Sequence, residues 1–198
     1  MYLHGTIIYK MANFLVWVYA KLFYGIKVSG TQNIPKEGAI VFVSNHISAV
    51  DPPFLGMASP RVLNMMAKKE LFEKQPLRWL VRQLLAFPVD REGNAMSAIK
   101  EALRRLKMGA AVLVFIQGTR KEDVSEAMNG ASFLAQRAKA VIIPIGIWQI
   151  GRRYFVNFGE PITPKGKSKE EMAALTDSML ININSLLPKE KQSIRLEP

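Results

Sequence analysis

Three short apolar runs constrain the fold of this chain more than any other feature. Residues 39–43, 111–116 and 141–147 are almost uninterrupted in apolar character and rich in β-branched side chains. A run of this length, bounded by glycine, proline or polar residues, is typical of a strand that is buried on both faces. Such strands occur in parallel sheets whose two faces are covered by helices, so these runs predict an α/β fold.

Segments with helical periodicity separate the apolar runs, as that fold requires. The clearest covers 94–108, which ends before Gly109 and carries Glu101 and Arg105 one turn apart. Its apolar residues at helical spacing are expected to face inward: Met96, Ile99, Leu103 and Leu106. Further helices are expected at 52–59, 76–86, 126–139 and 168–187, and further strands at 26–29, 62–66 and 154–158. The pattern predicts a single domain with a mixed, largely parallel sheet covered by helices.

Composition limits the chemistry that the chain can perform. It has 198 residues, a formal net charge of +11, no cysteine and two histidines. The absence of cysteine excludes disulfides, thiolate metal sites and a cysteine nucleophile, and two histidines argue against a zinc site. No metal and no bound cofactor is therefore expected. The positive charge indicates an anionic partner, which could be a membrane surface, a nucleic acid or a phosphorylated substrate.

Residues 5–25 are expected to form an amphipathic N-terminal helix. Its apolar stripe at helical spacing is Ile7, Met11, Phe14, Leu15, Val18 and Leu22. The residues that flank this stripe are typical of a helix lying in a bilayer interface: Tyr9, Trp17, Tyr19 and Tyr24, with Lys10 and Lys21. The alternative is a terminal helix that docks on the domain with its aromatic residues in the core. Because Lys10, Asn13 and Lys21 interrupt the segment and no cleavage site follows it, we expect neither a membrane span nor export.

A histidine and an aspartate follow the first apolar run. His46 is the only histidine apart from His4, and an imidazole held by a carboxylate such as Asp51 can act as a general base. On a continuous helix the two residues would point roughly 140° apart, so they meet only if the chain turns between them. Pro52 favours such a turn. The alternative interpretation is that Asp51 merely caps the following helix and His46 is an ordinary loop residue.

Three basic residues, Lys68, Arg91 and Arg120, are expected at strand-to-loop junctions, where a sheet usually presents its functional groups. Arginine and lysine in such positions suit a phosphate, although each alone could be a solvated surface charge. The chain has no P-loop, no G-x-G-x-x-G and no G-x-S-x-G motif. The expected base would therefore activate a substrate hydroxyl rather than a protein nucleophile.

Taken together and in order, four blocks resemble the glycerolipid acyltransferases of the 1-acylglycerol-3-phosphate acyltransferase (lysophosphatidic acid acyltransferase) type. The first block is Asn45, His46 and Asp51; the second is Lys68, Glu70 and Leu71 with 87–91; the third is Gln117, Gly118, Thr119 and Arg120; the fourth is 141–146 with Pro144. The resemblance covers about 26–148. It divides the chain into an N-terminal membrane-interface segment, 1–25, and an acyltransferase domain, 26–198.

The resemblance implies an activity and roles for these residues. His46 would be the general base, Asp51 would orient it, and Lys68, Arg91 and Arg120 would bind the phosphate of the acceptor. The implied substrates are an acyl thioester, on coenzyme A or acyl carrier protein, and the sn-2 hydroxyl of 1-acyl-sn-glycerol 3-phosphate, which would yield phosphatidic acid. The implied partners are an anionic membrane surface and acyl carrier protein, with no nucleic acid, at the cytoplasmic face of the cell membrane.

The third block departs from the family pattern. Gln117 stands where the family usually has glutamate, and Ile116 where proline is common, so the side chain keeps its size but loses its charge. Two alternatives therefore stay open: an acyltransferase for another lysophospholipid acceptor, or a weakly active, peripheral phospholipid-binding protein. Nucleic-acid binding would rest on the net charge alone.

Overall fold

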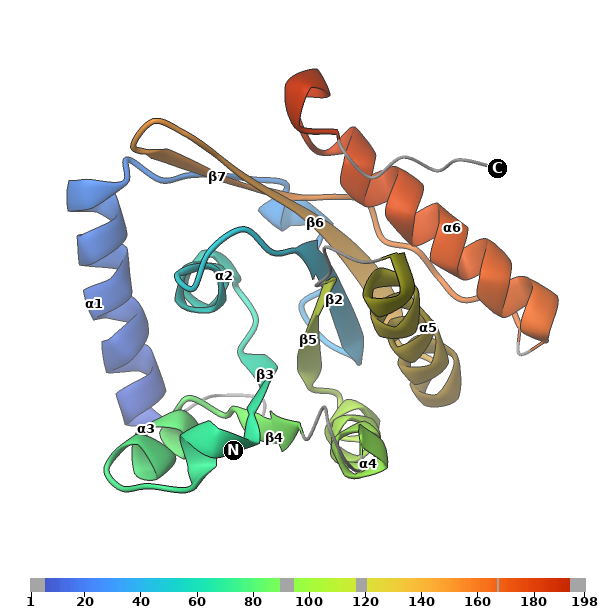
Figure 1. Cartoon of the computed structure of the whole chain (residues 1–198), viewed down its shortest axis with the longest axis horizontal. Coiled ribbons are helices and arrows are strands. Elements are labelled where there is room, and N and C mark those ends of the chain that lie inside the picture. The colour runs from blue at the N-terminus through green and yellow to red at the C-terminus, as the bar shows by residue number, and fades with distance from the viewer. Residues whose placement is uncertain (1–5, 90–94, 117–120, 167, 193–198) are drawn as a thin grey trace.

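The computed structural model describes residues 6–89, 95–116, 121–166 and 168–192 (Figure 1). These residues form three layers, a seven-stranded sheet with helices on both faces, so the predicted α/β fold is confirmed. The strands are β1 (Lys27–Ser29), β2 (Ile40–Asn45), β3 (Leu63–Lys68), β4 (Phe87–Val89), β5 (Ala111–Ile116), β6 (Val141–Ile150) and β7 (Arg153–Phe158). The α-helices are α1 (Ile7–Phe23), α2 (Asp51–Ala58), α3 (Leu77–Gln83), α4 (Ala95–Lys107), α5 (Lys121–Ala138) and α6 (Lys169–Ser185). A 3₁₀ turn, η2 (Lys69–Phe72), follows β3.

The sheet is mixed and largely parallel, as predicted. Its strand order is β1-β7-β6-β2-β5-β3-β4, and among the paired strands of the described residues β6 and β7 alone are antiparallel. Strand β3 pairs with β5 as far as Met65 opposite Leu113, and its last three residues then pair with β4. Because β2, β5, β3 and β4 run in one direction, their carboxyl ends meet at one edge of the sheet. Asn45 and Lys68, the last residues of β2 and β3, lie at that edge.

Alternation along the strands divides the core into two clusters, one on each face of the sheet. Val41 and Val43 of β2 pack with α4, α5 and α6, whereas Ile40 and Phe42 pack on the opposite face with α2 and the inner side of α1. Figure 1 shows α4, α5 and α6 together on one side of the sheet and α1 and α2 on the other. Burial on both faces explains why the apolar runs are almost uninterrupted.

Helix α4 has the predicted extent, but one inward residue was predicted wrongly. Met96 is 53% exposed, whereas Ala98, Ala102 and Leu106 are buried. The stripe of small residues brings α4 close to the sheet and turns Met96 outward. The ion pair of Glu101 with Arg105 is confirmed, with 2.7 Å between Oε1 and Nε.

Helix α1 docks on the domain through few residues. Tyr9 and Ala20 are buried, and the Asn13 amide donates a hydrogen bond to the Gly56 carbonyl at the end of α2. The outward side keeps large apolar residues in solvent, and those of the predicted stripe that are 60% to 79% exposed are Ile7, Met11, Phe14, Leu15 and Leu22. Helix α1 is thus docked on one side and apolar on the other. Within the described residues, no helix has both the length and the apolar character needed to cross a membrane.

Candidate active site

The loop after β2 starts from a fixed point. Asn45, the last residue of the strand, donates through its side-chain amide to the Ile147 carbonyl of β6 and accepts from the Ile147 N–H, both at 2.7 Å. The last backbone pair between β2 and β6 joins Ser44 to Ile145. Beyond it, the Asn45 side chain bonds to β6 in place of a backbone partner. This clamp gives Asn45 a structural role at the point where the loop leaves the sheet.

His46 and Asp51 meet across that loop, as the predicted turn requires. The His46 Nδ1 lies 2.5 Å from Asp51 Oδ2, and the same oxygen accepts hydrogen bonds from the backbone N–H groups of Ile47 and Ser48 at 2.6 and 2.9 Å. Asp51 is fully buried, whereas 18% of the His46 side chain is exposed. The carboxylate therefore organises the entire turn.

The alternative interpretation, in which Asp51 merely caps the helix, is wrong. Helix α2 begins at Asp51 itself, Val50 is its N-cap residue, and no side chain caps it. The Asp51 oxygens accept from residues that precede the helix rather than from its first turn. Asp51 still benefits from the helix dipole, because a negative charge in the first turn faces the positive end of the helix.

The geometry assigns the two imidazole nitrogens of His46 different tasks. Nδ1 is the donor to Asp51, because the same Oδ2 also accepts hydrogen bonds from two backbone N–H groups. Nε2 has no hydrogen-bond partner among the described residues. The ring stacks on Phe115 of β5, with 4.3 Å between centroids and 26° between planes. The ring thus has a fixed orientation, and Nε2 is the nitrogen available to a ligand.

Tyr154, which the sequence did not single out, completes the surroundings of the carboxylate. Its hydroxyl donates a hydrogen bond to Asp51 Oδ1, the oxygen that the loop leaves unoccupied. Tyr154 is the second residue of strand β7 and lies 103 positions from Asp51. No local motif could have joined the two residues. The only available signal was an aromatic residue with a hydroxyl at the start of a predicted buried strand.

Three of the predicted site residues in the second and fourth blocks lie within the described residues: Lys68, Glu70 and Pro144. Lys68 ends β3 at the same edge of the sheet as His46, and both Lys68 and Glu70 of η2 are exposed. Pro144 is buried in β6 opposite Val43 of β2 and accepts a hydrogen bond from the Gly159 N–H through its carbonyl oxygen. The predicted site residues Arg91, Gln117, Gly118, Thr119 and Arg120 lie outside the described residues.

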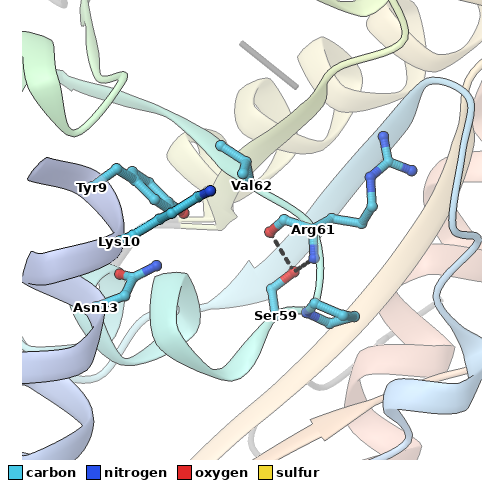
Figure 2. A pocket seen from close by; sticks show the side chains of 7 residues that line it. Tyr9, Lys10, Asn13, Ser59, Arg61 and Val62 are labelled. Atoms are coloured by element: carbon cyan, nitrogen blue, oxygen red, sulfur yellow. Dashed lines mark hydrogen bonds between the residues drawn. The ribbon is translucent and has the colours of Figure 1, made fainter. Parts of the chain in front are cut away.

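A separate pocket of about 260 Å³ lies at the far end of α2 from the dyad (Figure 2). It is lined by Tyr9, Lys10, Asn13, Ser59, Pro60, Arg61 and Val62. The guanidinium of Arg61 points away from this pocket (Figure 2). It donates hydrogen bonds to the carbonyls of Pro35, Gly38 and Gly109 at 2.8 to 2.9 Å. Arg61 therefore braces loops at the opposite edge of the sheet.

The chain belongs to the Acyltransferase family, because the family model with that description matches residues 25–148. The expectation of an acyltransferase is thereby confirmed. The match begins after α1 and includes the loop that holds His46 and Asp51.

Two curated relatives and one solved structure agree with this assignment. The chain is 31% identical to the 1-acyl-sn-glycerol-3-phosphate acyltransferase of Bacillus subtilis, over 93% of this chain and 99% of that protein. It is 29% identical to the enzyme of the same name from Streptococcus pneumoniae, over 83% of this chain and 58% of that protein. The crystal structure of the 1-acyl-sn-glycerophosphate acyltransferase PlsC from Thermotoga maritima superposes with a TM-score of 0.71 at 25% identity, over 96% of this chain and 81% of that one.

Proposed function

We propose that the protein transfers a fatty acyl group from an acyl thioester to the sn-2 hydroxyl of 1-acyl-sn-glycerol 3-phosphate, which forms phosphatidic acid. The names of the similar proteins support the substrates. The single observation that carries the reaction is the hydrogen bond between His46 and the buried Asp51, which leaves Nε2 of the imidazole without a partner among the described residues. An imidazole oriented in this way is suited to take a proton from a hydroxyl group.

The proposed reaction proceeds by direct attack of the acceptor. Nε2 of His46 takes the hydroxyl proton as the acceptor oxygen bonds to the thioester carbonyl carbon, and Asp51 stabilises the resulting imidazolium. The carbon–sulfur bond then breaks, and the imidazolium returns the proton to the departing thiolate. The products are an ester and a free thiol of coenzyme A or acyl carrier protein. Every step uses one base, and no protein nucleophile is required.

Lys68 is proposed to hold the phosphate of the acceptor together with Arg91 and Arg120. Its position at the carboxyl end of β3, two strands from β2, supports this role, because two strand spacings of about 5 Å place the strand ends roughly 10 Å apart. The side chains of His46 and Lys68 extend from these ends, which suits an acceptor whose phosphate and reacting hydroxyl belong to one glycerol unit. Fixing the phosphate would convert binding energy into orientation of the hydroxyl.

A bilayer is proposed as the surface on which the protein works, at the cytoplasmic face of the cell membrane, where the acyl thioesters are found. The outward face of α1 supports this placement, and so does a second patch on η2 and α3. Leu71, Leu77, Trp79 and Leu80 are exposed there, among the basic residues Lys69, Lys74, Arg78 and Arg82. Thr6 before α1 donates a hydrogen bond to the Gln83 carbonyl at the end of α3, so the two patches adjoin. Apolar side chains mixed with cations suit an anionic lipid surface.

The chain is also proposed to divide by task at residue 25. Residues 1–25 would hold the bilayer, and 26–198 would carry the reaction. The start of the family match at residue 25 supports this division.

The decisive test replaces His46 by alanine in the purified chain. Acyl transfer from a long-chain acyl-CoA to 1-acyl-sn-glycerol 3-phosphate should fall about a hundredfold or more, because the general base is lost. His4→Ala is the matched control, since His4 is the only other histidine, and it should keep full turnover. His46→Ala should still bind vesicles that contain phosphatidic acid, because the membrane surfaces are intact.

Three results would change the proposal. Full turnover in His46→Ala would overturn the assignment of the base. Transfer to other lysophospholipids but not to 1-acyl-sn-glycerol 3-phosphate would redirect the acceptor. Vesicle binding by the wild-type chain without transfer to any acceptor would favour the lipid-binding alternative.

A further inference from the structure

Asp51 has two oxygens, and the loop satisfies only one of them. Oδ2 accepts hydrogen bonds from His46 and from the N–H groups of Ile47 and Ser48, whereas Oδ1 accepts from the Tyr154 hydroxyl. The carboxylate is fully buried, so water does not serve Oδ1. An ionised carboxylate with one unsatisfied oxygen in such a place would carry a substantial desolvation cost. The hydroxyl from β7 removes that cost.

The Tyr154 ring has little freedom to move. It packs edge-on against Phe54 of α2, with 4.9 Å between centroids, and against Tyr24, with 6.4 Å. Its backbone N–H donates to the Tyr24 carbonyl at 3.1 Å. The ring is fully buried and enclosed by elements on either side of the turn. The hydroxyl is therefore held at one place relative to Asp51.

We infer that Tyr154 is a positioning residue for the proposed His46–Asp51 dyad, which it serves by fixing the rotation of the Asp51 carboxylate and by sharing its negative charge. This inference rests on the proposed function. Because the hydrogen bond at Oδ1 fixes the carboxylate, Oδ2 accepts the hydrogen bond from Nδ1 of His46 in one direction only. The orientation of the imidazole plane is fixed as a result. Tyr154 does not touch the reacting atoms, so it acts through Asp51.

The pKa of the Tyr154 phenol is consistent with a hydroxyl that always acts as a hydrogen-bond donor. Burial, and then the hydrogen bond to Asp51, raise the pKa of Tyr154 well above its ordinary value. The hydroxyl consequently keeps its proton throughout the working range of an enzyme. A group that never loses this proton can stabilise the carboxylate but cannot act as a base.

Removal of the Tyr154 hydroxyl should change the proton affinity of the dyad in a predictable direction. Without the hydrogen bond at Oδ1, more of the negative charge lies on Oδ2, which then binds a protonated imidazole more strongly. A buried carboxylate that lacks a hydrogen bond on one oxygen also takes up a proton more readily. Both effects keep a proton on the dyad to higher pH. Among the described residues, the titratable groups that face this carboxylate are His46 and Tyr154, and Tyr24 faces the Tyr154 ring.

The test is Tyr154→Phe, which keeps the ring and deletes only the hydroxyl. We expect kcat/KM to fall about tenfold, the size expected for a hydrogen bond to a charged group, and the acid limb of its pH profile to move to higher pH. Tyr9→Phe is the matched control, because Tyr9 is also buried and its hydroxyl accepts from the Leu63 N–H at 3.0 Å, far from the dyad. A loss of stability alone would affect both variants alike and leave both pH profiles unmoved.

A double-variant cycle separates action through Asp51 from any other cause. Tyr154→Phe should have almost no further effect on kcat/KM when Asp51 is already replaced by asparagine. An unmoved acid limb, or an equal loss of rate in the Asp51→Asn background, would overturn the inference.

A second measurement does not need catalysis. With two histidines in the chain, the imidazole ¹⁵N NMR titration of His46 is assigned by comparison with His4→Ala. The His46 titration should move to higher pH in Tyr154→Phe and stay in place in Tyr9→Phe. If the wild-type chain transfers no acyl group, the proposed function fails, whereas an unmoved NMR titration defeats the role of Tyr154 itself.

Discussion

The two faces of the sheet are covered in opposite ways. The face under α4, α5 and α6 is closed by small and apolar residues that point inward, and a buried hydrogen bond of 2.8 Å between Ser132 and Thr176 joins α5 to α6. On the other face, where Figure 1 shows α1 and α2, helix α1 buries only Tyr9 and Ala20 among its residues and exposes most of its large apolar side chains. The helices on the first face bury their apolar side chains, whereas α1 on the other face exposes several large ones. This contrast supports the proposal that the protein meets lipid through the side of α1.

The strongest way to break this contrast is to make the outward face of α1 polar. Phe14, Leu15 and Leu22 are each more than 60% exposed, so replacing all three by serine should alter the free energy of unfolding in water very little. If they enter the bilayer, the variant should lose about 4 kcal/mol of binding, roughly a thousandfold in partition, since a buried side chain of this size contributes about 1.5 kcal/mol or more. Sedimentation with anionic vesicles measures the partition. Unchanged partition would mean that α1 does not insert.

Met128→Ala on α5 should have the opposite pattern of effects, on stability rather than on vesicle binding. Met128 is fully buried, and its truncation should lower the free energy of unfolding by about 2 to 5 kcal/mol through lost packing and a cavity. Urea denaturation measures this loss. Vesicle partition of the folded variant should equal that of the wild type. A parallel loss of vesicle binding would show that the two faces do not act independently.

The sequence predicted the buried strands better than the contacts between distant elements. Strands β2 and β5 were predicted almost to the residue because each is apolar along its whole length, and the contact of His46 with Asp51 was predicted because Pro52 makes the chain turn. Strand β4 was missed, since it has three residues and contains Pro88. The assignment of Arg91 and Arg120 to phosphate binding stays a prediction.

Tyr154 was missed for a different reason. Periodicity and motifs report neighbours within a turn or a strand, whereas the bond from Tyr154 to Asp51 arises from the β6–β7 hairpin returning beside α2. Met96 was misplaced because Ala98, Ala102 and Leu106, spaced four residues apart, form the inner stripe of α4. Tertiary packing decides both cases.

The smallest predicted effect concerns electrostatics on the closed face. Hydrogen bonds from Arg104, and then from Arg105, lower the pKa of Glu101 to about 2, against an ordinary value of 4.5. The pKa of the folded state lies below that of the unfolded chain, so this carboxylate stabilises the fold above about pH 4.5 and loses that effect as the pH falls toward 2. Solvent screens the partly exposed pair, so the contribution is about 1 kcal/mol.

Glu101→Gln measures that contribution directly. The variant should be about 1 kcal/mol less stable than the wild type at pH 6, and the difference should shrink between pH 4.5 and 2. Urea titrations at several pH values give the comparison. A constant difference across this range would assign the effect to packing rather than to charge.

The position of Tyr24 bears on how this protein can be shortened. Tyr24 follows the last residue of α1, and its ring lies 5.1 Å from that of Phe54 and 6.4 Å from that of Tyr154. A shortened chain that begins after residue 25 would lack the Tyr24 ring, which packs beside the residues around Asp51. The buried Asp51 carboxylate would then become accessible to water. Such a fragment would differ from the intact protein in its chemistry as well as in its attachment, and low activity in it would say little about membranes.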